Sequence, residues 1–216
     1  MRYDKGYMSA DGDTPSSDVR ELDRRAVLDS AAFVTQVVPA DLARPTPCEG
    51  WTLRDLLLHM AAQHRGFADA AAGGGMDLEI WQPRAEIADP VAEYQASVDV
   101  VIDAFAAPGV LDRRFGLAEF GAEATFPAEQ AIGFHLVDYV VHAWDVARTL
   151  GREYQPDDDV ATAALAVALA VPNGPERTRP GAAFRPGTDL GPGVPVIDRI
   201  VAHLGRDPDW SPGDER

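Results

Sequence analysis

The chain has 216 residues, of which 46% are apolar and 25% are charged, and its formal net charge is −16 at pH 7. This length and composition suit one globular domain with a substantial core. The large negative charge repels nucleic acid and anionic membrane surfaces, so we expect neither as a partner. The apolar runs are too short and too interrupted to span a bilayer.

The N-terminal residues lack the apolar run of a secretion signal, and the chain has a single cysteine, Cys48. A lone cysteine excludes an internal disulfide, which fits the reducing cytoplasm, where we expect the protein to be located. Residues 1–17 are polar and are predicted to be a disordered tail. Residues 18–208 are predicted to form one helical domain, followed by a C-terminal tail at residues 209–216.

Four long helices are predicted from the spacing of apolar residues, at positions 18–38, 52–72, 90–106 and 127–151. Thr52 and Asp55 have the spacing of a capping box at the start of the second helix, and Gly73 follows its end. Residues 110–126 are predicted to be irregular, with a short extended pair at most. A loop of this length between long helices is often functional.

Two shorter helices are predicted after Gly151, at residues 157–171 and 195–204. The segment between them, residues 172–193, is rich in Pro and Gly and is predicted to be a long surface loop. Long helices joined by loops pack as bundles. We therefore expect an all-α fold, a four-helix bundle with short extra helices at the C-terminus.

The predicted helix at 127–151 carries polar residues where a core stripe is expected. His135, Asp138, His142 and Asp145 stand at i, i+3, i+7 and i+10 on one face, and most of the other residues are apolar. Imidazoles and carboxylates on a buried helix must be paired, hydrogen-bonded or bound to a cation. Because Asp138 and His142 are i, i+4 neighbours, both can reach one ion. We interpret this face as half of a metal site.

His59 is the third candidate ligand, because it lies on the apolar face of the helix at 52–72. Two imidazoles and one carboxylate suit zinc first, with nickel or ferrous iron as alternatives. Three protein ligands leave a coordination position open to water or substrate, as in catalytic centres. A histidine on an apolar face can also be a core residue that is hydrogen-bonded to backbone or hydroxyl groups, and that interpretation stays open.

Other side chains near these ligands have two interpretations each. His135 and Asp145 are candidates for orienting the ligands by hydrogen bonds, but Asp145 can equally pair with an arginine. Arg65 and Trp144 are candidates for contacting a bound cofactor, although Arg65 can be a surface or ion-paired residue and Trp144 a packing residue. Cys48, just before a helix N-terminus, is either a reactive thiol or a small buried hydrophobe.

Three further residues are expected to lie outside the site. His64 is five residues from His59, off the shared face, and is expected to be exposed to solvent. His203 is expected on the surface. Trp51 is expected to be a packing residue.

Three stretches of the sequence resemble one family: VVPADLARPTPCEGWTLRDLLLHM, HLVDYVVHAWDVARTLG and VPVIDRIVAHLGRDP. Together they resemble the DinB-like metal-binding superfamily, and within it the mycothiol-dependent maleylpyruvate isomerase N-terminal type. The resemblance covers about residues 20–208. It implies a DinB-like four-helix bundle with a divalent metal held by three side chains, here His59, Asp138 and His142.

The resemblance also implies a chemistry. Characterised relatives use the metal with a low-molecular-weight thiol, mycothiol or bacillithiol, and act as S-transferases or thiol-dependent isomerases on a small electrophile. A divalent cation lowers the pKa of a bound thiol, and the thiolate is a good nucleophile. A hydrolase that uses metal-bound water and a non-catalytic metal- or ligand-binding protein are the alternatives. We expect a monomer or a homodimer.

Overall fold

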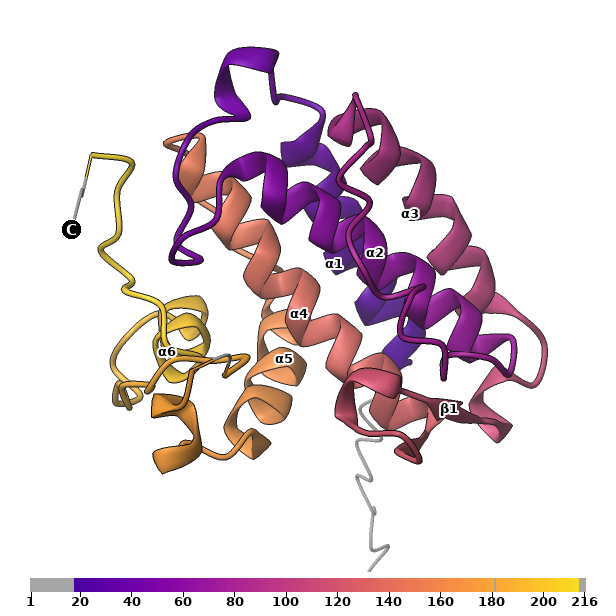
Figure 1. The fold of residues 1–216 in the computed structure, drawn as a ribbon. Helices are drawn as coiled ribbons and strands as arrows, with labels where there is room; N and C mark the ends of the chain where they lie inside the picture. Colours follow the sequence, from indigo (N-terminus) through magenta and orange to yellow (C-terminus); the bar gives the residue numbers. More distant parts are fainter. Residues whose placement is uncertain (1–17, 181, 214–216) are drawn as a thin grey trace, which may run out of the picture.

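The structure is a computed structural model that describes residues 18–180 and 182–213, and these residues are mostly helical (Figure 1). Its helices and strands are α1 (Val19–Val34), α2 (Leu53–Ala71), α3 (Pro90–Ala106), β1 (Arg114–Gly116), β2 (Thr125–Pro127), α4 (Ala128–Thr149), α5 (Asp158–Ala170) and α6 (Val196–His203). Short 3-10 helices are η1 (Pro39–Asp41), η2 (Val110–Asp112), η3 (Ala118–Phe120) and η4 (Pro175–Thr178). The predicted tail at 1–17 lies outside the described residues.

The four long helices pack as two pairs. α1 lies along α4, and α2 lies along α3, while α1 also contacts α3 and α2 also contacts α4 (Figure 1). α5 packs on α4, and α6 packs on α5. The prediction of an all-α four-helix bundle with short extra helices at the C-terminus is confirmed.

Local signals explain where the helices begin and end. The side chain of Thr52 accepts a hydrogen bond from the Asp55 backbone N–H, and Asp55 Oδ2 accepts from the Thr52 backbone N–H at 2.9 Å, which completes the predicted capping box. α1 ends at Val34, four residues before the predicted end. The chain continues in tighter i→i+3 turns at Gln36 and Val37, and Val38 is extended, as expected of a residue that precedes proline.

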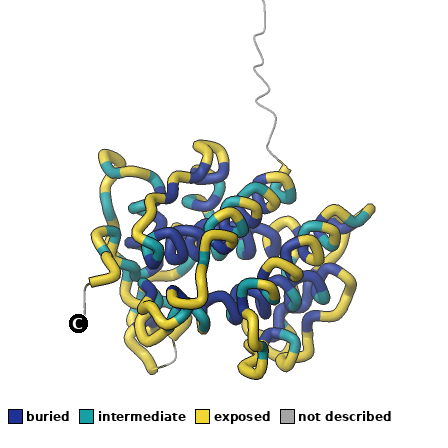
Figure 2. Tube along the Cα trace, turned by 90° about the horizontal axis from the view of Figure 1, so that it is seen from above, coloured by how far each residue is buried: buried dark blue, intermediate teal, exposed yellow. Residues whose placement is uncertain are grey.

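α4 runs through the middle of the bundle, and most of its residues are buried. Figure 2 shows such buried residues, in dark blue, gathered in the interior of the bundle. It is tied to α2 by the Tyr139 hydroxyl, which donates to the backbone oxygen of Met60 at 2.5 Å. Within its buried length, Phe134 and Asp138 are only half-buried. These two residues are one helical turn apart, so they share a stripe along which α4 reaches the surface.

The segment between α3 and α4 contains the short extended pair that the sequence predicts. β1 and β2 are antiparallel, with Phe115 opposite Phe126. η3 lies in the connection between them. In the part of the chain that the structure describes, no helix is long and apolar enough to cross a membrane.

Candidate metal centre

His59 from α2 and Asp138 and His142 from α4 come together where the polar face of α4 reaches the surface. One ligand atom from each of the three lies within 4.8 Å of the other two. His142 Nε2 is 3.2 Å from Asp138 Oδ1, and the rings of His59 and His142 meet edge to face with centroids 5.4 Å apart. Because the Asp138 side chain is 30% exposed, the group is open to solvent on one side.

The ring of His59 is held by ring contacts. Its neighbours are the ring of His142 and the indole of Trp51, whose centroid is 4.9 Å away, and it makes no hydrogen bond within the described part of the chain. Burial, and then the charge of His142, lower the pKa of His59 to about 4. At neutral pH the ring is therefore neutral and has a free nitrogen lone pair, which is the form that binds a metal ion.

Asp138 and His142 form an ion pair. Burial alone raises the pKa of Asp138, but the imidazoles of His142 and His59 outweigh it and lower the pKa below its ordinary value. Burial alone lowers the pKa of His142, but Asp138 and Asp145 outweigh it and hold the pKa well above its ordinary value. The pair therefore binds one positive charge, a proton, at a position where a metal cation can replace it.

Asp145 holds the other side of the His142 ring. Its Oδ2 accepts from His142 Nδ1 at 2.9 Å, from Arg206 Nη2 at 3.1 Å and from Cys48 Sγ at 3.2 Å. Burial alone raises the pKa of Asp145, but Arg206 and His142 outweigh this and hold the pKa below its ordinary value, so the carboxylate stays ionised. A carboxylate on Nδ1 fixes the ring so that Nε2 faces Asp138, which is the usual arrangement behind a metal-bound histidine.

Cys48 reaches Asp145 because of the turn that precedes α2. The hydroxyl of Thr46 donates to the backbone oxygens of Cys48 and Trp51 at 3.1 Å each, and Gly50 adopts a φ of +80°, which favours glycine. The thiol is half-buried, with Arg206 Nη2 3.5 Å from its sulfur. Cys48 is therefore a polar contact of Asp145, which neither sequence interpretation foresaw.

Cys48, His142 and Asp145 form a second group whose potential ligand atoms lie within 4.8 Å of one another. This group already contains a cation, because the guanidinium of Arg206 pairs with Asp145 at 3.1 Å. In the group of His59, Asp138 and His142, among the residues that the structure describes, no arginine is ion-paired with Asp138 in this way, and no hydrogen bond uses the ring nitrogens of His59. The structure therefore favours the latter group, called the triad below, as the one that fits a metal ion.

The structure does not bring His135 into the triad. Its Nδ1 is 2.6 Å from Oδ1 of Asp23 on α1, and both side chains are buried. Its ring stacks on Tyr139, as does the ring of His64, each with centroids 4.2 Å apart. His135 thus belongs to a second, inner cluster.

The prediction that His64 is exposed is wrong. The side chain is fully buried, with Nδ1 2.7 Å from the hydroxyl of Ser97 on α3, and burial lowers its pKa well below the ordinary value. α3 covers this face of α2. The sequence held a signal for this, since Ala61 and Ala68, at i−3 and i+4 from His64, mark a second apolar face of the same helix.

The remaining candidates lie elsewhere. Arg65 pairs with Glu93 on α3 at 2.5 Å, and Trp144 is buried in the core with the guanidinium of Arg148 over its ring. Trp51, which was expected to be a packing residue, is 37% exposed and packs its indole against the ring of His59 at the surface. Nε2 of the half-buried His203 lies 3.1 Å from the backbone oxygen of Val171.

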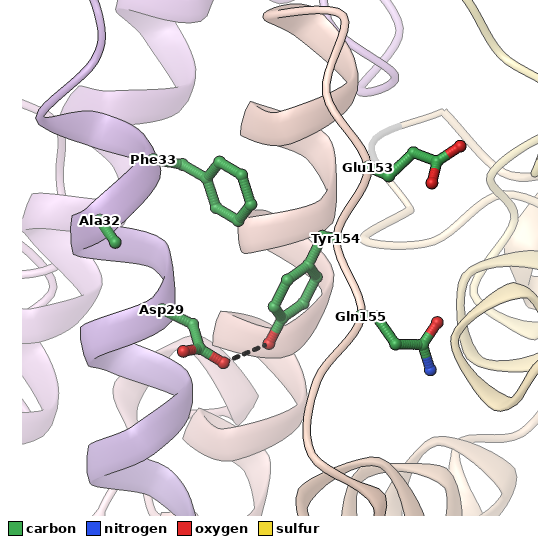
Figure 3. A pocket seen from close by; sticks show the side chains of 6 residues that line it. All are labelled: Asp29, Ala32, Phe33, Glu153, Tyr154 and Gln155. Atoms are coloured by element: carbon green, nitrogen blue, oxygen red, sulfur yellow. Dashed lines mark hydrogen bonds between the residues drawn. The ribbon is translucent and has the colours of Figure 1, made fainter.

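A cavity of about 300 Å³ lies on another side of the bundle, between α1 and the segment after α4 (Figure 3). The phenol of Tyr154 donates to Asp29 across it at 3.2 Å. Its lining contains none of the triad residues. This cavity is therefore separate from the candidate metal centre.

The family model described as the mycothiol maleylpyruvate isomerase N-terminal domain matches residues 24–147, a segment that contains the whole triad. The chain belongs to this family. Two similar proteins, uncharacterised proteins from two strains of Mycobacterium tuberculosis, are each 32% identical over 181 residues. Those alignments cover 82% of this chain and 91% of each relative.

Two solved structures share the fold. The mycothiol-dependent maleylpyruvate isomerase matches with a TM-score of 0.59 over 88% of this chain and 89% of that chain, at 15% identity. A histidine-to-alanine mutant of such an isomerase matches with a TM-score of 0.55 over 77% of this chain and 72% of that chain, also at 15% identity. The predicted DinB-like bundle is thus confirmed at the level of the fold.

Proposed function

We propose that the protein catalyses a mycothiol-dependent reaction of a small electrophile, as an isomerase or an S-transferase, at a divalent metal ion held by His59, Asp138 and His142. The observation that carries the proposal is the convergence of three ligand atoms from two helices within 4.8 Å of one another. The family match over residues 24–147 supports it, as does the fold shared with the mycothiol-dependent maleylpyruvate isomerase.

The donor set fits a divalent ion. Two imidazoles and one carboxylate suit zinc first and nickel or iron second, and the exposed side of Asp138 leaves room for a further ligand. When bound, such an ion lowers the pKa of a thiol ligand and supplies thiolate at neutral pH.

The protein's own groups prepare the ligands. Asp145 fixes the ring of His142, and Arg206 balances the charge of Asp145 so that this carboxylate stays ionised in a buried position. Trp51 covers one side of His59. Because these partners hold the rings before any ligand binds, less ordering is needed when it does.

With mycothiol bound at such an ion, its thiolate would supply the nucleophile. In an isomerase the sulfur would add to one carbon of a conjugated alkene while the electron pair moved toward the carbonyl. Rotation about the resulting single bond and loss of the thiolate would then restore the alkene in the other geometry. In an S-transferase the sulfur displaces a leaving group, which departs with the bonding electron pair.

The test uses the zinc-loaded protein with mycothiol and two uncharged electrophiles, dimethyl maleate for isomerisation and 1-chloro-2,4-dinitrobenzene for transfer. We expect at least one reaction to run about tenfold or more above the uncatalysed rate, a barrier lowered by ~1.4 kcal/mol, and to stop on chelation. Re-addition of Zn²⁺ should restore it, and His142→Ala should lack it. Equal mycothiol binding with and without chelator would remove the thiolate mechanism, and turnover without mycothiol would indicate water as the nucleophile.

A further inference from the structure

An aromatic group adjoins the triad along the half-buried stripe of α4. Phe134 lies one turn before Asp138, and its ring stacks on Phe120 with centroids 5.3 Å apart and packs edge-on against Phe126 at 5.2 Å. These three residues, the Phe cluster, come from α4, η3 and β2. Phe120 is 57% exposed, so the Phe cluster presents an aromatic face to solvent beside the stripe.

η3 also brings a carboxylate to the same place. Glu119 Oε2 accepts from Nε2 of Gln63 at 3.0 Å, and Gln63 lies one turn after His59 on α2. Burial raises the pKa of Glu119, the hydrogen bond from Gln63 lowers it, and the negative charge of Asp138 raises it again. η3 therefore lies beside the triad, with the Phe cluster on its apolar side and Glu119 on its polar side.

The positive charges around the triad are already bound to protein groups. Arg206 contacts Asp145 through two nitrogens, Arg65 pairs with Glu93, and Arg148 donates to the backbone oxygen of Pro208. Arg54, on α2, donates to the backbone oxygens of the segment before α3. Among the described residues, Arg206 and Arg65 would each have to give up or share a carboxylate partner to bind a substrate carboxylate. The one lysine of the sequence, Lys5, is outside the described residues.

The balance of charge around the triad disfavours an anionic substrate. Asp138 and a thiolate together offset a divalent ion, and Glu119 remains as a further carboxylate beside them. A carboxylate placed there loses water and meets like charge without a partner, and both effects are unfavourable. Resting on the proposed thiol chemistry, we infer that the electrophile carries no carboxylate and that it places an apolar group against the Phe cluster.

The test compares matched electrophiles at saturating mycothiol on the zinc-loaded protein. Dimethyl maleate and maleate differ in the two carboxylate charges, and each rate is divided by the rate without protein. We expect the resulting enhancement to be about tenfold or more greater for the diester, since like-charge contacts are costly. An equal or greater enhancement for maleate would overturn the inference and leave the proposed function standing. If neither is accelerated and 1-chloro-2,4-dinitrobenzene is not either, the proposed function itself fails; if only 1-chloro-2,4-dinitrobenzene is accelerated, the inference about the diester is overturned.

Binding gives a readout that does not depend on turnover. Dimethyl succinate and succinate lack the reactive alkene, so calorimetry with zinc and mycothiol present measures affinity alone. The diester should bind, and the dianion should bind about tenfold or more weakly. Tighter binding of succinate would overturn the charge argument whatever the rates show.

Two variants separate the apolar and the charge contributions. Phe134→Ala should raise KM for the diester about three- to tenfold, the usual effect of losing one aromatic contact, with unchanged zinc content. The matched control is Phe33→Ala, at the cavity of Figure 3, which should leave KM unchanged. Glu119→Arg should shift the preference toward maleate. Equal effects of both phenylalanine variants on KM, or an unchanged preference in Glu119→Arg, would overturn the inference that η3 and the Phe cluster contact the substrate.

Discussion

Two polar clusters on the same pair of helices have opposite characters. The triad has an exposed edge at Asp138, and its ligand atoms face one another. The inner cluster, His64 with Ser97 and His135 with Asp23, is sealed, and each imidazole uses Nδ1 for a partner on a third helix. In the described structure Nε2 of both inner rings is buried without a hydrogen-bond partner.

The difference comes from what lies across from each cluster. α3 and α1 cover the inner rings and supply a hydroxyl and a carboxylate, so each of those histidines has one core partner, at Nδ1. At the triad the turn before α2 contributes only the ring contact of Trp51, which leaves His59 without a side-chain hydrogen bond in the described structure. Identical residue types therefore serve structure in one place and fit a metal ion in the other.

The largest expected effect is on metal content. His59→Ala should lose bound zinc after dialysis, because two remaining ligands hold it poorly, whereas His64→Ala should retain it. Elemental analysis of the two variants beside the wild type measures this. Zinc retained in His59→Ala at the wild-type level would show that the triad is not the metal site.

For stability we expect the larger effect at the inner cluster instead of the triad. Asp23→Ala leaves His135 buried without its partner, which should lower the free energy of unfolding by about 3–5 kcal/mol in urea denaturation with chelator present. Asp29→Ala is the matched control on the same helix, because it removes only a half-buried hydrogen bond to Tyr154 worth about 1 kcal/mol. Similar losses in both variants would contradict the special role of the inner pair.

Asp145 should tune metal binding without being a ligand. Asp145→Asn removes the charge that orients His142, so zinc affinity should fall by about 10- to 100-fold in competition with a chromophoric chelator. Asp23→Asn changes the carboxylate of the inner cluster and should leave the affinity unchanged. An unchanged affinity in Asp145→Asn would show that the triad does not need this support.

The inner cluster should also give a pH dependence. Burial lowers the pKa of His64 in the folded protein, so below its ordinary pKa of 6.5 the unfolded chain takes up a proton that the folded chain does not. Stability should therefore decrease as the pH falls below 6.5, by ~1.4 kcal/mol per pH unit for each such histidine. In metal-free protein His59 adds to this slope in the same direction down to its pKa of about 4.

His64→Phe should reduce the slope of the unfolding free energy against pH by the contribution of one proton. The measurement is the slope of unfolding free energy against pH in the chelated wild type and in the variant. Equal slopes in the wild type and the variant would mean that His64 has the same pKa in the folded and unfolded chains.

Helices and caps were predictable because their causes are local. The capping box at Thr52 and the first-turn proline of α3 act within one turn, and α2 and α3 begin where these signals stand. The end of α1 was missed by four residues because Pro39 acts on the backbone before it. The triad was proposed from residue type and helical spacing, and the structure brings those three side chains together.

Long-range partners were not predictable in this way. Asp23 is 112 residues from His135, and Arg206 is 61 residues from Asp145, so no helical period connects either pair. His64 was misplaced because its burial depends on α3, which carries Ser97. Cys48 was ambiguous for the same reason, since its contacts with Asp145 and Arg206 come from two other elements.

The amino-acid sequence by itself determined the helices and the chemical types that face inward, because backbone propensity, capping and helical periodicity act over a few residues. Only the tertiary structure decided which imidazoles are sealed and which stay open at an acidic, partly exposed edge. That choice depends on which side chains the packing of α1, α3, η3 and the segment after α6 places opposite each ring.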